Sequence, residues 1–238
     1  SSKRDTQNII FQWIEKNNRY SSKSWEVDII AKRIIAWISN SKLTYEDAGP
    51  VYRSKFNNII KKQINHLINE IEKDEWVDNK MIGCAAIILA GLSYHDKDGY
   101  LNYGLNLLKR IIKFSFDNTG FPKSRNIRQL HFYLKYFILI REWLKESQNE
   151  IPEYIDENIY YLGQSYAFIW QNNKKDFLFN GNHESKNEDF DLYLKRLGYS
   201  FKNQSNELGG YAVLNNKKIV LAMDIGSSPD KRFSSNYQ

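Results

Sequence analysis

The stretch Met81–Leu92, MIGCAAIILAGL, carries no charged residue along its whole length. At the 3.6-residue period of an α-helix, such a run is apolar on nearly all sides. A helix of this kind is buried on more than one face. The run therefore predicts a helix at the centre of a helical domain, with other elements packed around it.

Amphipathic helical patterns occur on both sides of this run. Ile30, Ile34 and Ile38 recur at helical spacing and share one face. Four further apolar stripes follow the same rule: Phe56–Ile71, Leu101–Ile112, Tyr133–Leu144 and Ile155–Ile169. Short loops between such helices make neighbours antiparallel. The sequence has no fixed repeat period, which argues against a regular solenoid. We expect a mainly α fold, an (α/α) toroid-like array of antiparallel helical hairpins.

The pattern changes near residue 198. Two short β-type runs, Tyr211–Leu214 and Lys218–Ile225, flank the turn NNKK and predict a hairpin. A hairpin alone is only marginally stable, so we interpret it as the opening of a β-sandwich that is incomplete here. The predicted domains are residues 1–197, helical, and residues 198–238, the start of the sandwich.

Composition excludes several classes of protein. The formal net charge is +6, but basic and acidic residues are interspersed, which fits either a solvated surface or an anionic polymer as partner. The sequence has no basic stripe with interleaved aromatic residues, so we expect no nucleic-acid partner. Cys84 is the single cysteine and is expected to be a buried structural residue. The four histidines lack metal-ligand spacing, and no glycine-rich phosphate loop occurs, so we expect neither metal nor cofactor.

No apolar run approaches the roughly 18 residues needed to span a membrane, and we expect no membrane partner. The chain does not begin with Met, and its first ten residues lack a signal-peptide apolar segment. We therefore expect a processed or excised piece of a longer protein. Periplasmic and cytoplasmic locations both remain open at this stage, as does the oligomeric state.

A turn-rich segment, Asp117–Asn126, leads directly into a long aromatic helix. If the helix begins at Arg125, then Asn126 and Tyr133 lie two turns apart on one face. Backbone N–H groups at a helix N-terminus favour an anion, and Arg125 could grip a carboxylate there. In the alternative, Asn126 caps the helix, Arg125 pairs with a nearby acid and Tyr133 lies in the core.

Five motifs, in order, resemble segments of the heparinase II/III-like family of polysaccharide lyases. The buried helix is similar to one that opens with Asn-His in that family, and the turn resembles its D-G-G-H-x-S-R-N motif. The motifs read SWEVDIIAKRIIAWI (24–38), DNKMIGCAAIILAGLSY (78–94), DNTGFPKSRN (117–126), DFLFNG (176–181) and GGYAVLNNKKIVLAMDIGSSPDKRFSSNYQ (209–238).

The resemblance implies a toroid and a β-sandwich with an anionic polysaccharide in the cleft between them. It also implies β-elimination, in which one group neutralises a uronate carboxylate, a base removes the C5 proton and an acid assists the leaving oxygen. Asn79 matches the family's neutralising Asn, whereas Lys80 stands where the family has His. The family's Tyr after the turn has no match in register, although His131 and Tyr133 lie nearby.

The candidate residues therefore fall into two groups. Asn79, Asn126 and Tyr133 are the candidate catalytic residues, and Lys80, Arg125, His131 and His183 are the candidate substrate-binding residues. Two functions fit these residues. One is a fragment of a polysaccharide lyase that is active when complete, and the other is a non-catalytic glycan-binding or structural helical module.

Overall fold

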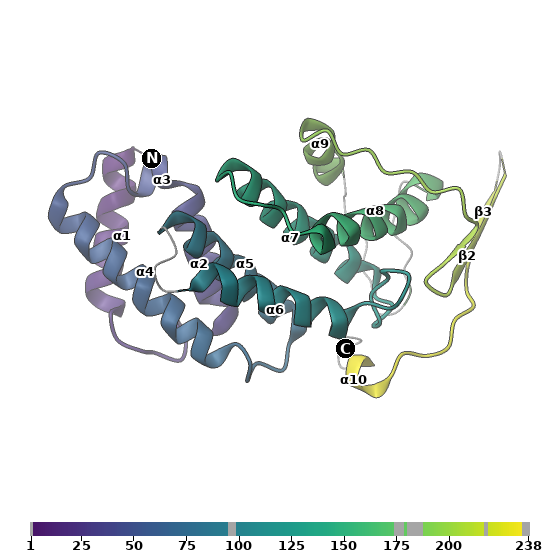
Figure 1. Cartoon of the computed structure of the whole chain (residues 1–238), viewed down its shortest axis with the longest axis horizontal. Helices are drawn as coiled ribbons and strands as arrows, with labels where there is room; N and C mark the ends of the chain where they lie inside the picture. The colour runs from purple at the N-terminus through teal and green to yellow at the C-terminus, as the bar shows by residue number, and fades with distance from the viewer. Residues whose placement is uncertain (1, 95–98, 174–178, 180–187, 217–218, 235–238) are drawn as a thin grey trace. The chain divides into compact units, whose positions relative to one another are not determined.

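The structure, a computed structural model, describes residues 2–94, 99–173, 179, 188–216 and 219–234. Helices dominate it, and one small sheet lies near the C-terminal end of the chain (Figure 1). The chain divides into two compact units, Ser1–Ile111 with Glu146–Gln148, and Ile112–Lys145 with Asn149–Gln238. Each unit is described separately below.

The first unit is helical throughout its described part. Its elements are α1 (Lys3–Asn17), α2 (Val27–Ser39), α3 (Ser41–Thr44), α4 (Pro50–Glu70), α5 (Val77–Ser93) and most of α6 (Tyr100–Ser115). Local sequence explains where two of them start. Ser2 and Asp5 form a reciprocal capping box at α1, and Pro50 occupies the first turn of α4, where its missing N–H costs nothing.

Helix α5 is the centre of the first unit. Every residue from Met81 to Gly91 is buried, as the apolar run predicts. Helices α2 and α4 both pack against it, and its contact with α6 is close enough for the Cys84 thiol to donate to the Gly104 carbonyl at 3.1 Å. Burial also raises the pKa of the Cys84 thiol. Cys84 is thus the buried structural residue that the sequence predicted.

The second unit contains α7 (Ile127–Glu146, its last residue excepted), α8 (Glu153–Asn173), α9 (Glu188–Arg196), the sheet and α10 (Lys231–Ser234). Phe116 packs against α7, with its ring 4.8 Å from that of Tyr133 and 6.1 Å from that of Phe137. Arg141 on α7 forms an ion pair with Asp156 on α8 at 2.5 Å. The aromatic contacts belong to the apolar core of the second unit, and the ion pair links α7 to α8 at its surface.

The sheet has three antiparallel strands in the order β1 (Glu207–Leu208), β2 (Tyr211–Asn215) and β3 (Val220–Asp224). In the β2–β3 pair, Tyr211 lies opposite Asp224. Tyr211 and Val213 are buried, because alternate side chains of a strand point to the same face. Several aliphatic side chains of the hairpin are exposed: Leu214, Ile219, Val220, Leu221 and Ile225.

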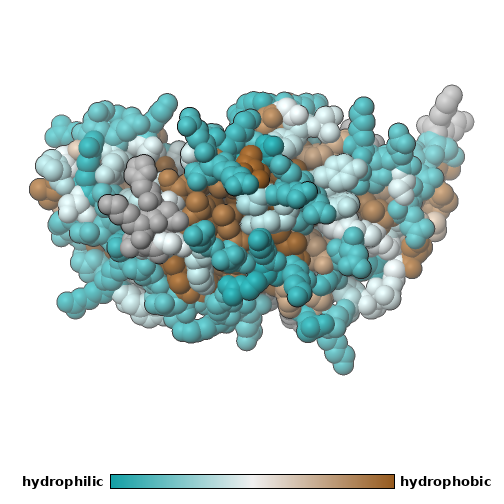
Figure 2. All heavy atoms as spheres, in the orientation of Figure 1, coloured by the Kyte–Doolittle hydropathy of each residue, from teal (hydrophilic) through white to brown (hydrophobic). Residues whose placement is uncertain are grey.

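The predicted fold class, mainly α with a short β segment, is confirmed. The predicted hairpin is confirmed as β2 and β3, and the structure adds the short strand β1. Strands begin after α9, close to the predicted change of character at residue 198, whereas the division between the two compact units falls within α6. Hydrophilic residues cover most of the face shown in Figure 2, as the interspersed charges indicate.

A substitution at Gly91 tests the close packing of α5 against α6. A Cβ at this position would lie 2.6 Å from the backbone nitrogen of Leu101 on α6, so the two helices would have to separate. We expect Gly91→Ala to lower the free energy of unfolding by about 1–3 kcal/mol, measured by urea denaturation. Gly49→Ala is the matched control, because nothing lies within 4 Å of a Cβ at Gly49. Equal stability of the two variants would contradict the packing described for α5.

Candidate functional site

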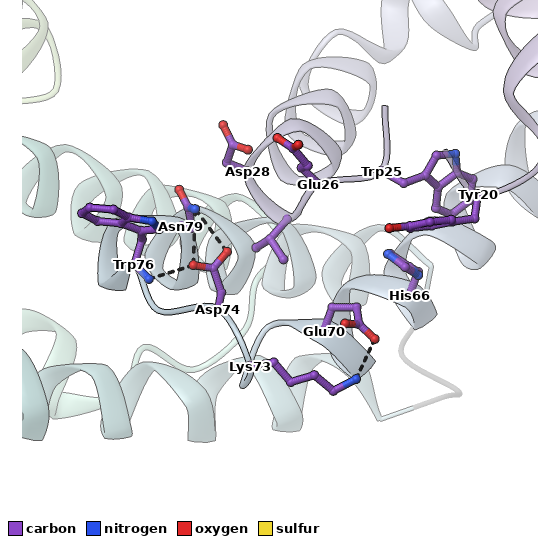
Figure 3. Close-up of a pocket in the computed structure, with 11 residues that line it drawn as sticks. Tyr20, Trp25, Glu26, Asp28, His66, Glu70, Lys73, Asp74, Trp76 and Asn79 are labelled. Carbon is purple, nitrogen blue, oxygen red and sulfur yellow. Dashed lines mark hydrogen bonds and ion pairs between the residues drawn. The ribbon is translucent and has the colours of Figure 1, made fainter. Parts of the chain in front are cut away.

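A cavity of about 670 Å³ opens in the first unit, between the N-terminal ends of α2 and α5 and the C-terminal end of α4 (Figure 3). Its lining consists of Tyr20, Trp25, Glu26, Val27, Asp28, His66, Glu70, Lys73, Asp74, Trp76 and Asn79. Of the sequence-predicted candidates that the structure describes, Asn79 alone belongs to this lining. We call this hollow the α5 cavity.

Two exposed aromatic rings stand on opposite sides of the α5 cavity (Figure 3). Tyr20 is 66% exposed and Trp76 is 50% exposed. Trp25 differs from them, because it is 3% exposed and its indole N–H donates to the Asn17 carbonyl at 3.2 Å. His66 contacts both Tyr20 and Trp25 on that side, with ring centroids 5.4 and 5.3 Å apart. Tyr20 and Trp76 therefore offer flat apolar surface at the cavity, while Trp25 anchors the wall.

Asn79 is oriented by Asp74. Its side-chain amide donates to the Asp74 carboxylate oxygens at 3.1 and 3.4 Å, and Asp74 also accepts from the backbone N–H of Trp76 at 2.8 Å. Helix α5 begins at Val77 after Trp76, so Asn79 lies within the first turn and does not cap the helix. Within the described residues, no group donates to the side-chain amide oxygen (Oδ1) of Asn79. That oxygen can accept a hydrogen bond from a ligand.

Carboxylates outnumber cations in the α5 cavity. Its described lining contains one ammonium, that of Lys73, and four carboxylates, those of Glu26, Asp28, Glu70 and Asp74. Lys73 lies 2.8 Å from Glu70, and its hydrogen bond lowers the pKa of the Glu70 carboxyl. The lining is therefore negatively charged at neutral pH, whereas the chain as a whole carries +6.

Lys80, the neighbour of Asn79, does not line the cavity. Its ammonium donates to the backbone carbonyl of Glu72 at 3.2 Å, which holds the side chain along the connection between α4 and α5. Asn79 and Lys80 are thus adjacent in sequence, but only Asn79 faces the hollow.

In the second unit, Arg125 holds the turn before α7 to the sheet region. Its guanidinium donates to the carbonyls of Gly209 and Gly210 at 3.3 and 2.9 Å. It also donates to the Ser227 carbonyl at 2.8 Å and forms an ion pair with Asp224. The side chain is only 11% exposed. These donors are engaged within the chain, which favours the ion-pair interpretation of Arg125 over a grip on a ligand carboxylate.

Tyr211 completes this arrangement, which we call the Arg125 clamp. The Tyr211 hydroxyl donates to the Arg125 carbonyl at 2.6 Å, and the guanidinium lies over the Tyr211 ring at 4.9 Å. Arg125 adopts φ = 57°, a left-handed conformation that costs a non-glycine residue about 1 kcal/mol or more. The clamp contacts hold the residue in that conformation.

Asn126 caps α7. Its side-chain oxygen accepts from the backbone N–H of Arg128 at 2.9 Å. Its backbone carbonyl accepts from the backbone N–H of Gln129 at 3.1 Å. The residue is 5% exposed. The structure therefore agrees with the interpretation in which Asn126 caps the helix. Ser124 supports the turn by accepting from the Asn126 N–H at 3.2 Å.

Tyr133 and His131 lie on α7 among aromatic side chains. Tyr133 is 1% exposed and packs edge-on against Phe116, the core position that the apolar stripe predicts. His131 is partly buried, with its ring 5.0 Å from that of Tyr166 and 6.3 Å from that of Phe190. His183 lies outside the described residues.

The structure thus groups the candidate residues differently from the prediction. Arg125 and Asn126 share one turn in the second unit, and Tyr133 lies in the core of that unit. Asn79 belongs to a cavity in the first unit whose other polar residues the sequence analysis did not select. A signal for them existed in KDEWVDNK (73–80), where an exposed Trp stands among acidic residues directly before a buried helix.

Two searches of the described residues returned nothing. No group of three or more His, Cys, Asp or Glu side chains in the described ranges could hold a metal ion. Among the helices of the described part, none is long and apolar enough to cross a membrane.

Comparison with known proteins gives one fold-level match. No protein-family model and no curated protein matches the sequence. Among solved structures, the chain is similar to heparinase III, with a TM-score of 0.71 and 14% sequence identity over 96% of this chain. The match spans 41% of the heparinase III chain. The fold that the five sequence motifs implied is thereby confirmed as heparinase-like.

The Arg125 clamp makes a prediction about stability. In Arg125→Ala, three backbone carbonyls and the Asp224 carboxylate lose a charged donor at a largely buried site. We expect the free energy of unfolding to fall by about 3 kcal/mol, measured by urea denaturation. Arg125→Lys is expected to recover only part of this loss, because one ammonium cannot reproduce the planar fork.

Arg128→Ala is the matched control, because Arg128 is exposed on the first turn of the same helix. This variant should unfold at the same urea concentration as the parent chain. If Arg125→Ala unfolds at the same urea concentration as Arg128→Ala, the clamp is not a stabilising contact. The carboxylate-binding interpretation of Arg125 would then be favoured.

Proposed function

We propose that this chain is a glycan-binding module of a heparinase II/III-like protein, and that the α5 cavity holds a sugar residue. One observation carries the proposal. Two exposed aromatic rings, Tyr20 and Trp76, flank a cavity whose remaining lining is mostly polar. The similarity of fold to heparinase III, a protein named for its action on a polysaccharide, supports it.

The chemistry of a sugar fits this lining. A pyranose ring has apolar C–H faces that pack on aromatic side chains, and its hydroxyl groups both donate and accept hydrogen bonds. In the cavity, Tyr20 and Trp76 provide the apolar surfaces. Hydroxyl protons of the sugar can be accepted by the carboxylates of Glu26 and Asp74 and by the side-chain oxygen of Asn79. The cavity volume of about 670 Å³ is within the range of small-molecule sites.

Lyase activity of the longer protein is the second candidate. Asn79, Tyr20 and His66 line one cavity, and Asn, Tyr and His are the residue types that family members use for β-elimination. Two of the lining carboxylates, Glu26 and Asp74, form no ion pair within the described residues and would repel a uronate. Tyr133 is buried in the core of the second unit. The described residues therefore favour sugar binding over a complete elimination site.

Aromatic truncation tests the binding proposal. We expect Trp76→Ala and Tyr20→Ala each to weaken oligosaccharide binding about tenfold, because each removes one apolar surface of the cavity. Binding is measured by calorimetry with three hexamers: N-acetylglucosamine, glucosamine and an alginate uronate. The control is Tyr160→Ala, which removes a 57% exposed tyrosine in the second unit. If no hexamer binds, or if Tyr160→Ala weakens binding as much, the proposal fails.

The elimination chemistry makes a separate prediction. We expect these 238 residues alone to release no unsaturated product from heparan sulfate or alginate, followed by ultraviolet absorbance. The reason is that Asn79, the residue that would neutralise a uronate, donates its side-chain amide to Asp74, and the unpaired carboxylates of the cavity would repel the substrate. Turnover by the isolated chain that Asn79→Ala abolishes would overturn this prediction and favour the lyase candidate.

A further inference from the structure

We propose that the α5 cavity selects a glycan residue with a protonated amino group, an unsubstituted hexosamine, over a uronate. This inference rests on the proposed function and names the chemical class of sugar. Three features of the lining carry it: two carboxylates without a cationic partner, an amide that presents its oxygen, and an exposed indole face.

Glu26 and Asp74 are the two unpaired carboxylates. Asp28 has Lys32 as a partner at 2.7 Å, and Glu70 has Lys73. Within the described residues, neither Glu26 nor Asp74 forms an ion pair, and Asp74 accepts only from the neutral donors of Trp76 and Asn79. An ammonium group on the ligand would supply a countercharge to either of them, whereas a ligand carboxylate would add to the unpaired negative charge.

The orientation of Asn79 points in the same direction. To neutralise a uronate, an Asn must donate its N–H groups to the sugar carboxylate. Here the amide nitrogen donates to Asp74, so a ligand carboxylate at that nitrogen would lie beside the Asp74 carboxylate, whereas the side-chain oxygen accepts from no described group. An oxygen acceptor matches an ammonium or a hydroxyl donor and repels a carboxylate. Asn79 is therefore positioned for a donor-rich sugar.

Trp76 adds a contact that favours positive charge. Its indole is 50% exposed and lies on the same side of the cavity as Asp74 and Asn79 (Figure 3). A cation over an indole face is attracted by the ring quadrupole. A hexosamine can thus place its C–H face or its ammonium against Trp76 while the same ammonium reaches the Asp74 carboxylate.

The net charge of the chain sharpens the argument. A protein of +6 repels a polycation over most of its surface, so tight binding of an amino sugar requires a local negative site. Outside such a site, the same surface favours uronate oligomers. A preference for glucosamine over a uronate would therefore run against the overall charge and would have to arise from a site such as the α5 cavity.

The experiment compares hexamers of glucosamine, N-acetylglucosamine and alginate uronate, with spermine as a linear amine, on the complete 238-residue chain. We expect glucosamine hexamer to bind at least about tenfold more tightly than the N-acetylated hexamer. This preference should shrink as salt screens the charges and vanish when pH is raised above the pKa of the sugar amine. Spermine should bind more weakly, because it lacks a ring face for Tyr20 and Trp76.

Glu26→Gln is the test variant, because Glu26 is exposed and glutamine has nearly the same shape as glutamate without its charge. We expect it to weaken glucosamine hexamer binding about fivefold and to leave the N-acetylated hexamer unchanged. Glu157→Gln, at an exposed acidic residue of α8 in the second unit, should change neither.

The outcomes separate the two proposals. If glycans bind in a Trp76-dependent way but the N-acetylated or uronate hexamer binds as tightly as glucosamine, the amino-sugar inference fails and the glycan site stands. Equal binding of spermine, or equal losses in Glu26→Gln and Glu157→Gln, also overturns the inference. Absence of all hexamer binding removes the proposed function itself.

Discussion

The burial of α5 from Met81 to Gly91 is the constraint on which the first unit depends. A helix with no polar face must be covered on all sides, and its residues from Met81 to Gly91 are buried accordingly. Its polar N-terminal turn therefore has to emerge at the surface. The short connection before α5 brings Asp74, Trp76 and Asn79 to that end, beside the ends of α2 and α4. Hydrogen bonds from the Trp76 backbone and the Asn79 side chain to Asp74 hold these three residues together there.

The elements of the fold could be predicted from sequence because they depend on local periodicity. The uniformly apolar run gave a buried helix, and the alternating runs around NNKK gave the β2–β3 hairpin. The cap at Asn126 was also a local feature. The Arg125 clamp could not be predicted in this way, since the carbonyl partners of Arg125 lie 84 to 102 positions later in the chain. Only the folded second unit brings those carbonyls to the guanidinium.

The candidate site shows a similar division. Tyr133 belongs to an apolar stripe that already predicted a core position, and its proposed catalytic role came from the family resemblance. Asn79 also came from that resemblance, and it does line a cavity. Tyr20, Glu26 and His66 were not selected, because each is an ordinary polar or aromatic residue in its own segment. Their meeting with Asp74 and Trp76 depends on tertiary packing, which no sequence period records.

The similarity of fold and the chemistry of the α5 cavity are separate observations. The similarity to heparinase III covers 96% of this chain at 14% identity, while the α5 cavity is acidic and presents an amide oxygen. The measurement that tests this account most directly is a crystal structure of the chain with glucosamine hexamer. The account predicts a sugar ring between Tyr20 and Trp76, with its ammonium group within hydrogen-bond distance of Asp74 or Glu26. A hexamer bound elsewhere, with the α5 cavity empty, would contradict it.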